Sequence, residues 1–138
     1  MRIRQFCMED YNTVIDLWLT CGLHLGKSDS RESIEKILRR DADLFLVVEE
    51  GSTIVGAVMG RYDGRRGWVN HLAVSPTHQS RGWGRRMLQE LERRLQAKGC
   101  EKINLLVRLD NANVQSFYRK IGYQGDQLIF MEKWLQTV

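Results

Sequence analysis

Residues 72–88 read LAVSPTHQSRGWGRRML, and this stretch decides the fold. The apolar run Leu72–Val74 has the composition of a buried strand, and the apolar residues from Met87 onward recur with helical spacing. Between them lies a short loop that contains Gly82 and Gly84. A strand, a glycine loop and a helix in this order bring free backbone N–H groups and the positive end of a helix dipole together. The stretch therefore predicts a binding nest for a phosphate or pyrophosphate group.

The glycine loop does not identify its ligand by itself. The P-loop pattern GxxxxGK[ST] does not occur, and Met87 stands where the dinucleotide pattern GxGxxG requires its third glycine. A tight turn from strand to helix would explain the two glycines without any ligand. The same stretch carries Arg81, Arg85 and Arg86, which bring positive charge to the loop. A phosphate site and a plain turn both remain open at this point.

Patterns on both sides of this stretch predict a mixed sheet. Before it, we expect a strand at 3–6, a helix over 9–21, a helix that Asp29 and Glu32 open as a capping box, and strands at 44–49, 53–62 and 68–74. From the loop onward, we expect a helix over 82–98, a strand at 103–107, a helix over 111–121 and a strand at 128–131. Asp63-Gly64 is typical of a hairpin turn. The order β-αα-βββ-α-β-α-β predicts an α/β, or mixed α+β, fold with an antiparallel meander and a right-handed βαβ crossover.

Length and composition limit the class of protein. With 138 residues, of which 43% are apolar and 28% charged, we expect a single globular domain over residues 1–138. No run approaches the ~18 apolar residues of a membrane-spanning helix, and we expect neither a signal peptide nor a membrane partner. The cysteines number three and show no CxxC spacing, and the three histidines are scattered. This pattern favours a cytoplasmic protein without a metal site.

The positive charge is concentrated in the middle of the chain. The net charge of +4 divides into 7 basic and 10 acidic side chains in residues 1–60, 10 and 4 in residues 61–102, and 4 and 3 in residues 103–138. The basic middle segment contains the glycine loop, and it is compatible with an anion site, a nucleic-acid stripe or a solvated face. No helix-turn-helix, zinc or RNA-recognition signature accompanies it, so we expect no nucleic-acid partner.

Two motifs together resemble the GNAT superfamily of N-acetyltransferases. Residues 79–84, which follow a strand that ends in Leu-Ala-Val-x-Pro, are similar to its acetyl-CoA signature [Gln/Arg]-x-x-Gly-x-Gly. Residues 111–123, NANVQSFYRKIGY, resemble the family's helix with an early Asn and the later pattern Tyr-x-x-x-Gly-(Phe/Tyr). The predicted order of elements also matches, so the resemblance covers nearly the whole chain. The strand at 44–48 and residues 60–64, GRYDG, make the YpeA-like bacterial acetyltransferases the most similar group.

The resemblance implies a GNAT-like fold and a set of residues that bind acetyl-CoA as co-substrate. In this fold two central parallel strands splay apart within a mostly antiparallel sheet, helices cover both faces, and acetyl-CoA lies in the opening. The strand end would bond the pantetheine arm, the loop and first helical turn would bind the pyrophosphate, and Asn111 would cap its helix or bond the pantetheine. The set is Leu72, Ala73, Val74, Gln79, Ser80, Arg81, Gly82, Trp83, Gly84, Arg85, Asn111 and Tyr118.

The resemblance also implies direct transfer of the acetyl group to a primary amine. Tyr118 matches the family's tyrosine that protonates the departing thiolate, unless it only packs beside Phe117. The glutamate base of many members has no counterpart, because residues 51–89 contain no glutamate. His71 and Asn70 stand in the corresponding strand, and an imidazole has a suitable ordinary pKa, although a satisfied structural histidine is the favoured reading and a base acting through ordered water stays open. Regular alternation places His71 and Asn70 on opposite faces.

The acceptor amine is less visible in the sequence. In the family the first two helices and their loop shape the acceptor pocket, and here that region contains Asp29, Glu32 and Glu35. These charges favour a cationic acceptor, unless they are plain charges on the helix surface, and a peptide N-terminus, a lysine, a polyamine and an aminoglycoside all fit. The alternative function is a non-catalytic acyl-CoA-binding module that acts as a sensor or interaction domain. An edge strand at 128–135 could pair between subunits, so a monomer and a homodimer are both compatible.

Overall fold

The computed structural model describes residues 1–135. Contacts between residues group the chain into two compact units, residues 1–106 and the residues from Val107 onward. The first unit contains a five-stranded sheet whose strands lie in the order β1-β2-β3-β4-β5. The strands are β1 (Arg2–Gln5), β2 (Phe45–Glu50), β3 (Thr53–Tyr62), β4 (Gly67–Val74) and β5 (Ile103–Leu105). The first three pairings are antiparallel and the β4–β5 pairing is parallel, so the predicted mixed, mostly antiparallel sheet is confirmed.

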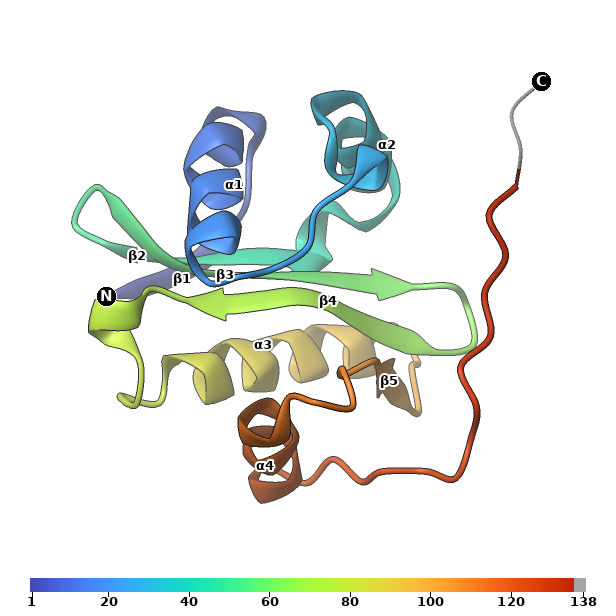
Figure 1. The fold of residues 1–138 in the computed structure, drawn as a ribbon. Coiled ribbons are helices and arrows are strands. Elements are labelled where there is room, and N and C mark those ends of the chain that lie inside the picture. The colour runs from blue at the N-terminus through green and yellow to red at the C-terminus, as the bar shows by residue number, and fades with distance from the viewer. Residues whose placement is uncertain (136–138) are drawn as a thin grey trace. The chain divides into compact units, whose positions relative to one another are not determined.

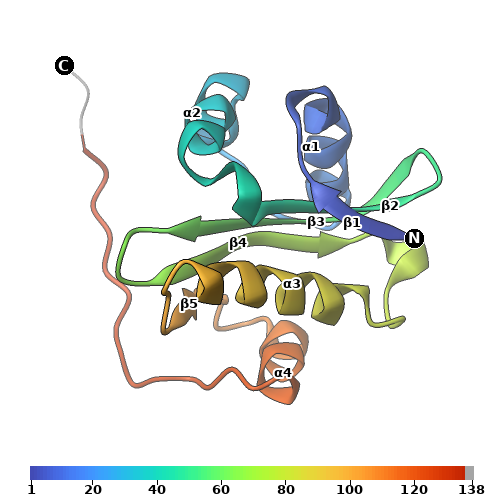
Figure 2. The ribbon, with the colours of Figure 1, turned by 180° about the vertical axis from the view of Figure 1, so that it is seen from behind.

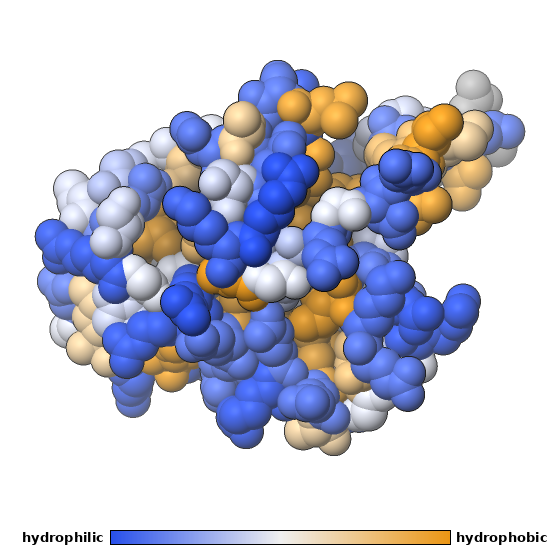
Figure 3. Space-filling model, turned by 90° about the horizontal axis from the view of Figure 1, so that it is seen from below, coloured by the Kyte–Doolittle hydropathy of each residue, from blue (hydrophilic) through white to orange (hydrophobic). Residues whose placement is uncertain are grey.

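Helices cover both faces of this sheet, as predicted. Helices α1 (Tyr11–Thr20) and α2 (Arg31–Asp41) lie on one face, and α3 (Trp83–Ala97) lies on the other (Figures 1 and 2). Seen from the side of α3, the surface is mainly hydrophilic, in keeping with the charged residues that this helix turns outward (Figure 3). The second unit contains one helix within its described residues, α4 (Ala112–Lys120). Across residues 1–135 no helix is both long and apolar enough to cross a membrane.

The core of the first unit has one layer on each face of the sheet. Beneath α1 and α2, the ring of Trp18 stacks on that of Phe45 with 5.8 Å between centroids, and both residues are fully buried. On the other face the apolar stripe of α3, which the sequence predicted, is buried as Met87, Leu88, Leu91 and Leu95. Burial of each such side chain contributes about 1.5–3 kcal/mol. The stripe therefore fixes α3, and with it the glycine loop, against the sheet.

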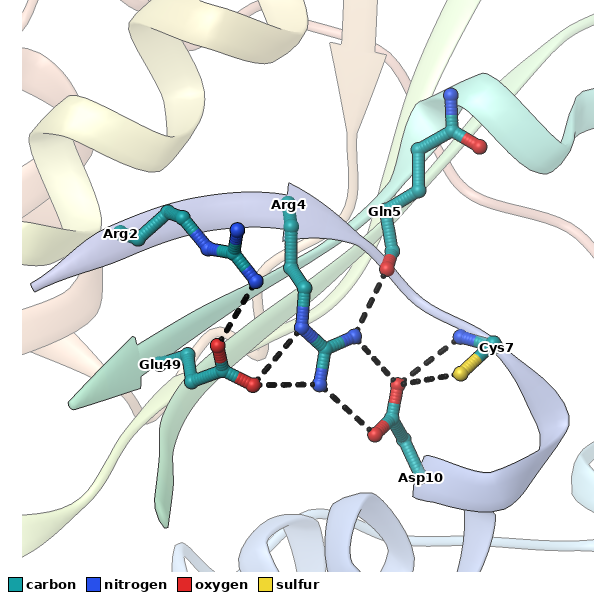
Figure 4. Close-up of polar contacts among 6 residues, drawn as sticks. All are labelled: Arg2, Arg4, Gln5, Cys7, Asp10 and Glu49. Carbon is teal, nitrogen blue, oxygen red and sulfur yellow. Dashed lines mark hydrogen bonds and ion pairs between the residues drawn. The ribbon is translucent and has the colours of Figure 1, made fainter. Parts of the chain in front are cut away.

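Arg4 fastens the first strand to its surroundings (Figure 4). Its guanidinium donates to Asp10 at 2.8 and 3.0 Å and pairs with Glu49 of β2 at 2.9 Å. The carboxylate of Asp10 also accepts from the Cys7 N–H at 2.9 Å, and these contacts hold its pKa below the ordinary value, with the Arg4 hydrogen bond as the largest cause. The cluster ties β1 to β2 and to the start of α1.

Three predictions about the elements differ from the structure. Residues 123–135 contain no helix or strand, so the strand expected at 128–131 is absent. That run has four consecutive apolar residues without alternation, which defines no register, and a strand forms only where a partner edge accepts its hydrogen bonds. The second helix is capped one residue later than expected: Ser30 accepts the N–H of Ser33 at 3.2 Å, and Asp29 is not the cap. The strand at 103 also ends two residues earlier than predicted, at Leu105.

Candidate active site

A bulge in β4 shapes the centre of the candidate site. Ala57 pairs with Ala73 and Met59 pairs with Asn70, so that His71 and Leu72 together oppose the single residue between Ala57 and Met59. His71 has a φ of +52°, a left-handed conformation that non-glycine residues rarely adopt. The extra residue breaks the alternation of side chains along the strand.

The bulge corrects the expectation that Asn70 and His71 face opposite sides. Asn70 lines a cavity together with Arg40 of α2. The His71 ring packs against Trp18 of α1, with 4.8 Å between centroids. Both helices lie on the same face of the sheet (Figure 1), so the two residues are directed to one side. Alternation failed as a guide because the register shift could not be read from composition.

The imidazole of His71 is held by a buried carboxylate. His71 Nε2 lies 2.9 Å from Asp29 Oδ1, which is the distance of a hydrogen bond from an imidazole N–H to a carboxylate. Asp29 is 5% exposed. Its second oxygen accepts the N–H of Gly26 at 3.0 Å, and its carbonyl accepts the hydroxyl of Tyr11 at 2.6 Å. This arrangement fixes the ring and leaves Nδ1 as the nitrogen that can take up a proton.

Asp29 is a functional candidate whose role the sequence did not reveal. Its acidic character suggested attraction of a cationic acceptor, and its position suggested a helix cap. In the structure the carboxylate of Asp29 is hydrogen-bonded to His71, which lies 42 residues later in the chain. No spacing rule links two residues that meet only through the packing of a loop against a sheet.

The parallel strands splay apart beyond their first few residues. β4 and β5 pair only through Gly67–Val69 with Ile103–Leu105. From Asn70 to Val74, β4 continues without a strand on its β5 side in the part of the chain that the structure describes. This stretch contains Leu72, Ala73 and Val74, the residues predicted to offer backbone hydrogen bonds. Within residues 1–135 no strand pairs with this edge, although the Val74 carbonyl already accepts the Gln79 amide at 2.9 Å and the Cys21 thiol at 3.3 Å.

The loop after β4 leaves backbone N–H groups free at the start of α3, where an anion could bind. Ser80 and Gly82 both have left-handed backbones, with φ values of +64° and +85°. Gly82 is the N-cap and provides no side chain, and the N–H of Arg86 makes the bond to its carbonyl at 3.0 Å. The N–H groups of Trp83, Gly84 and Arg85 precede this bond and belong to the unpaired first turn. A helix start of this kind binds phosphate oxygens.

The side chains of the loop have different surroundings. Gln79 Nε2 donates to the carbonyl of Val74 at 2.9 Å, which closes the loop onto the strand end. The Arg86 guanidinium lies 4.3 Å from the centre of the Trp83 ring, in a cation–π contact. Arg81 and Arg85 are exposed to solvent. The structure thus brings together ten of the predicted residues, Leu72 to Val74 and Gln79 to Arg85, on one strand-loop-helix segment.

The remaining predicted residues belong to the second unit. Asn111 Oδ1 accepts the N–H of Val114 at 3.2 Å, so Asn111 caps α4 as the simpler of its two expected roles requires. Tyr118 is 8% exposed, and its ring meets those of Phe117 and Tyr123 edge to face. Burial raises the pKa of the Tyr118 hydroxyl to about 12. The phenol therefore stays protonated throughout the neutral and mildly alkaline range.

Residues 1–135 contain no group of three His, Cys, Asp or Glu side chains placed to hold a metal ion. Cys7, Cys21 and Cys100 are free thiols.

Comparison with known proteins identifies the family. Residues 10–123 match the family model described as the acetyltransferase (GNAT) family. An acetyltransferase of Yersinia pestis is 42% identical over 135 residues, which cover 98% of this chain and 96% of the relative. An acetyltransferase of Sodalis glossinidius is 43% identical over 136 residues, with the same coverage.

Solved structures share the fold. The PaiA N-acetyltransferase of Thermoplasma acidophilum, solved in complex with coenzyme A, superposes with a TM-score of 0.81 at 23% identity, and the match covers 93% of this chain and 92% of that one. An aminoglycoside 6'-N-acetyltransferase of Acinetobacter haemolyticus gives a TM-score of 0.79 at 14% identity over 99% of this chain and 100% of that one. The family match, the relatives and the splayed sheet agree. The chain belongs to the GNAT family of acetyltransferases, which are acyltransferase enzymes.

Proposed function

We propose that this chain transfers an acetyl group from acetyl-CoA directly to a primary amine. The observation that carries the proposal is the unpaired edge of β4, followed through the loop at 75–82 by the start of α3, which no side chain caps. The family model extends over residues of both compact units, which supports one acetyltransferase domain over residues 1–138. The odd number of free thiols supports the cytoplasm as its location.

The residues of the strand-loop-helix segment fit acetyl-CoA. The backbone of Leu72 and Val74 would bond the pantetheine arm along the open strand edge. The N–H groups of Gly84 and Arg85 would face the pyrophosphate, since the left-handed Gly82 leaves the helix start uncapped. Acetyl-CoA supplies an activated acetyl group and a thiolate leaving group when bound.

His71 is the base in this proposal. Its Nδ1 takes the proton of the amine as the C–N bond to the acetyl carbon forms, while Asp29 holds Nε2–H and stabilises the imidazolium. Asp29 thus acts as a positioning residue through His71.

Tyr118 is the acid in this proposal. Its hydroxyl gives a proton to the sulfur as the C–S bond breaks, so that an acetamide and a free thiol leave the site. With a pKa of about 12, the phenol is a weaker acid than a thiol, whose ordinary pKa is about 8.5. We therefore place this proton transfer in the same step as cleavage of the C–S bond, because transfer as a separate step would be uphill.

A thiol-release assay across a panel of amines, together with a calorimetric titration with acetyl-CoA, tests the proposal. We expect binding and amine-dependent release of the thiol. His71→Gly tolerates the left-handed backbone and leaves space for added imidazole, which should restore part of the lost turnover. His78→Ala is the matched control, since the His78 side chain contacts Thr77 and Glu50 in the described contacts and its backbone N–H bond to Ser75 is kept. Absence of acetyl-CoA binding at high micromolar concentration would overturn the proposal.

A second candidate function is the non-catalytic acyl-CoA-binding module. It is favoured by the absence of glutamate from residues 51–89. Binding of acetyl-CoA without thiol release for any amine, in wild type as in the His71 variant, would support this candidate instead.

A further inference from the structure

A polar cavity lies beside the candidate base. It has a volume of about 260 Å³, and its lining residues are Arg40, Arg61, Tyr62, Asp63, Trp68 and Asn70. These come from the end of α2, from the β3–β4 hairpin and from β4 itself. The volume is below the roughly 300–1,000 Å³ of sites for drug-sized ligands, so the cavity suits a small metabolite.

The cavity is next to His71 on the same face of the sheet. Asn70 is the neighbour of His71 in the chain, and the bulge directs both to the face covered by α1 and α2. Trp68 lies three residues before His71, which corresponds to about 10 Å along a strand. The lining residue Asn70 is adjacent to His71 in the chain, so a small acceptor in this cavity would lie near the candidate base.

The anionic groups of the cavity are already satisfied by protein donors. Asp63 accepts the N–H groups of Arg66 and Arg65, each at 2.8 Å, and lies 3.4 Å from Trp68 Nε1. The two backbone N–H groups, that of Arg66 first, hold the pKa of Asp63 below its ordinary value. Its Oδ1 oxygen is thus committed to the hairpin turn and Oδ2 lies near the Trp68 indole, so the lining sets two guanidinium charges against one carboxylate charge.

The cationic groups keep unused donors. Arg40 Nη2 donates to the carbonyl of Tyr62 at 3.0 Å, a neutral partner. Arg61 uses Nε toward the buried Asp41 at 3.4 Å. Each guanidinium has five N–H groups, and in the described contacts each uses one of them. Two held guanidinium groups with free N–H donors form a receptor for a carboxylate or phosphate.

We propose that the acceptor is a small primary amine that carries an anionic group, bound in this cavity through Arg40 and Arg61 with Trp68 beside its body. This inference rests on the proposed acetyl transfer and names its substrate class. It differs from the cationic acceptor expected from Asp29, Glu32 and Glu35, because Asp29 is hydrogen-bonded to His71 and neither glutamate lines the cavity.

Matched acceptors that differ only in the anion provide the test. Phenylalanine, leucine and glutamate are each compared with their α-amides, and O-phosphoethanolamine is compared with ethanolamine. We expect kcat/KM at least tenfold higher for the anionic member of the preferred pair, and the two kinds of pair distinguish carboxylate from phosphate. Equal or better use of the neutral members would overturn the inference while leaving acetyl transfer intact.

Charge variants locate the effect in the cavity. Arg40→Gln removes one guanidinium, and Arg61→Lys keeps the positive charge beside Asp41 while losing the forked donors. Both should lower kcat/KM for the anionic acceptor at least tenfold and leave its neutral partner within twofold. Arg39→Gln is the control, since Arg39 is an exposed neighbour on α2 that does not line the cavity. Unchanged selectivity in both variants would refute the assignment of the anion to these arginines.

Product binding separates this inference from the proposed reaction. The N-acetylated form of the preferred acceptor is titrated into the protein by calorimetry beside its neutral analogue, a measurement that needs no turnover. Tighter binding of the anionic product, lost in Arg40→Gln, supports the cavity even if thiol release fails. Thiol release without such a preference refutes the cavity and keeps the enzyme.

Discussion

Gly60→Ala should destabilise the protein by about 2 kcal/mol, because β3 and α3 lie in close contact at this residue. A Cβ atom there would overlap Leu91 Cδ1 and lie 2.9 Å from the Leu44 carbonyl oxygen. Leu91 is fully buried, and the carbonyl belongs to backbone, so neither can move freely. Overpacking of this kind costs about 1–3 kcal/mol. Because one of the two clashes is with backbone, the upper end of this range applies; the lower entropy of the unfolded alanine chain returns about 0.4–1 kcal/mol of it, which leaves about 2 kcal/mol.

Gly56→Ala on the same strand is the matched control. Its Cβ would meet the Met87 Cε atom at 3.0 Å, which is the end of a flexible side chain, and the Ala73 carbonyl oxygen at 3.4 Å, an ordinary contact. Neither glycine has a left-handed backbone, so the comparison isolates the packing. We expect Gly56→Ala to change stability by less than about 1 kcal/mol, since a displaced methionine methyl and the entropy gain nearly cancel.

Urea unfolding followed by circular dichroism measures both effects. With a slope of roughly 2 kcal/mol per molar urea, the Gly60→Ala midpoint should fall by about 1 M at an unchanged slope. A Gly60→Ala protein as stable as the Gly56→Ala protein would refute the claim that α3 is seated directly on β3 at this point.

Three further predictions concern the catalytic side chains and the first strand. Tyr118→Phe should lower kcat more than tenfold and leave acetyl-CoA affinity within a few-fold, and wild-type activity should show no loss from Tyr118 ionisation below pH 10, since its pKa is raised to about 12. Steady-state kinetics as a function of pH measure both effects, and a wild-type kcat for Tyr118→Phe would contradict the acid role. Asp29→Asn should lower kcat at least tenfold with little change in KM, and combined with His71→Asn it should add almost nothing further; additive losses would show that Asp29 acts independently of His71. The pKa of Asp10 is lowered in the folded state, so the stability that it contributes is present above its unfolded pKa of about 3.9 and is lost as pH falls through the folded value. Between pH 7 and 3 the free energy of unfolding, measured with urea, should therefore fall more for the wild type than for Asp10→Asn. Equal decreases would show that the Arg4–Asp10 ion pair does not contribute to acid destabilisation.

The segments that the sequence predicted well are those in which one local signal decides the structure. The glycine loop, the apolar stripe of α3 and the Asp63-Gly64 hairpin each depend on a few neighbouring residues, and each forms as expected. Asn111 capped its helix for the same reason. In such segments the backbone preference of the residues and the spacing of the side chains predict the same structure, so the local sequence alone is enough to predict it.

The parts that sequence reasoning missed depend on contacts between distant residues. Asn70 and His71 share a face because of a register shift between β3 and β4, and register is a property of the pair of strands. Asp29 meets His71 only after α1 and its loop pack on the sheet. Arg40 reaches the cavity from the last turn of α2, opposite a hairpin more than twenty residues later. The apolar run at 128–131 gave no pairing information, and the structure places no strand there.

The left-handed backbone at His71 has a consequence for how this position can change over time. The paired residues on either side, Asn70 with Met59 and Ala73 with Ala57, hold the bulge through the main chain. The backbone therefore sets the direction in which the side chain at position 71 points, whichever residue occupies the position. A positive φ is tolerated best by Gly, Asn and Asp, so these replacements are structurally inexpensive. Natural variation at this one site could exchange the base, or discard it, without rebuilding the sheet that presents it.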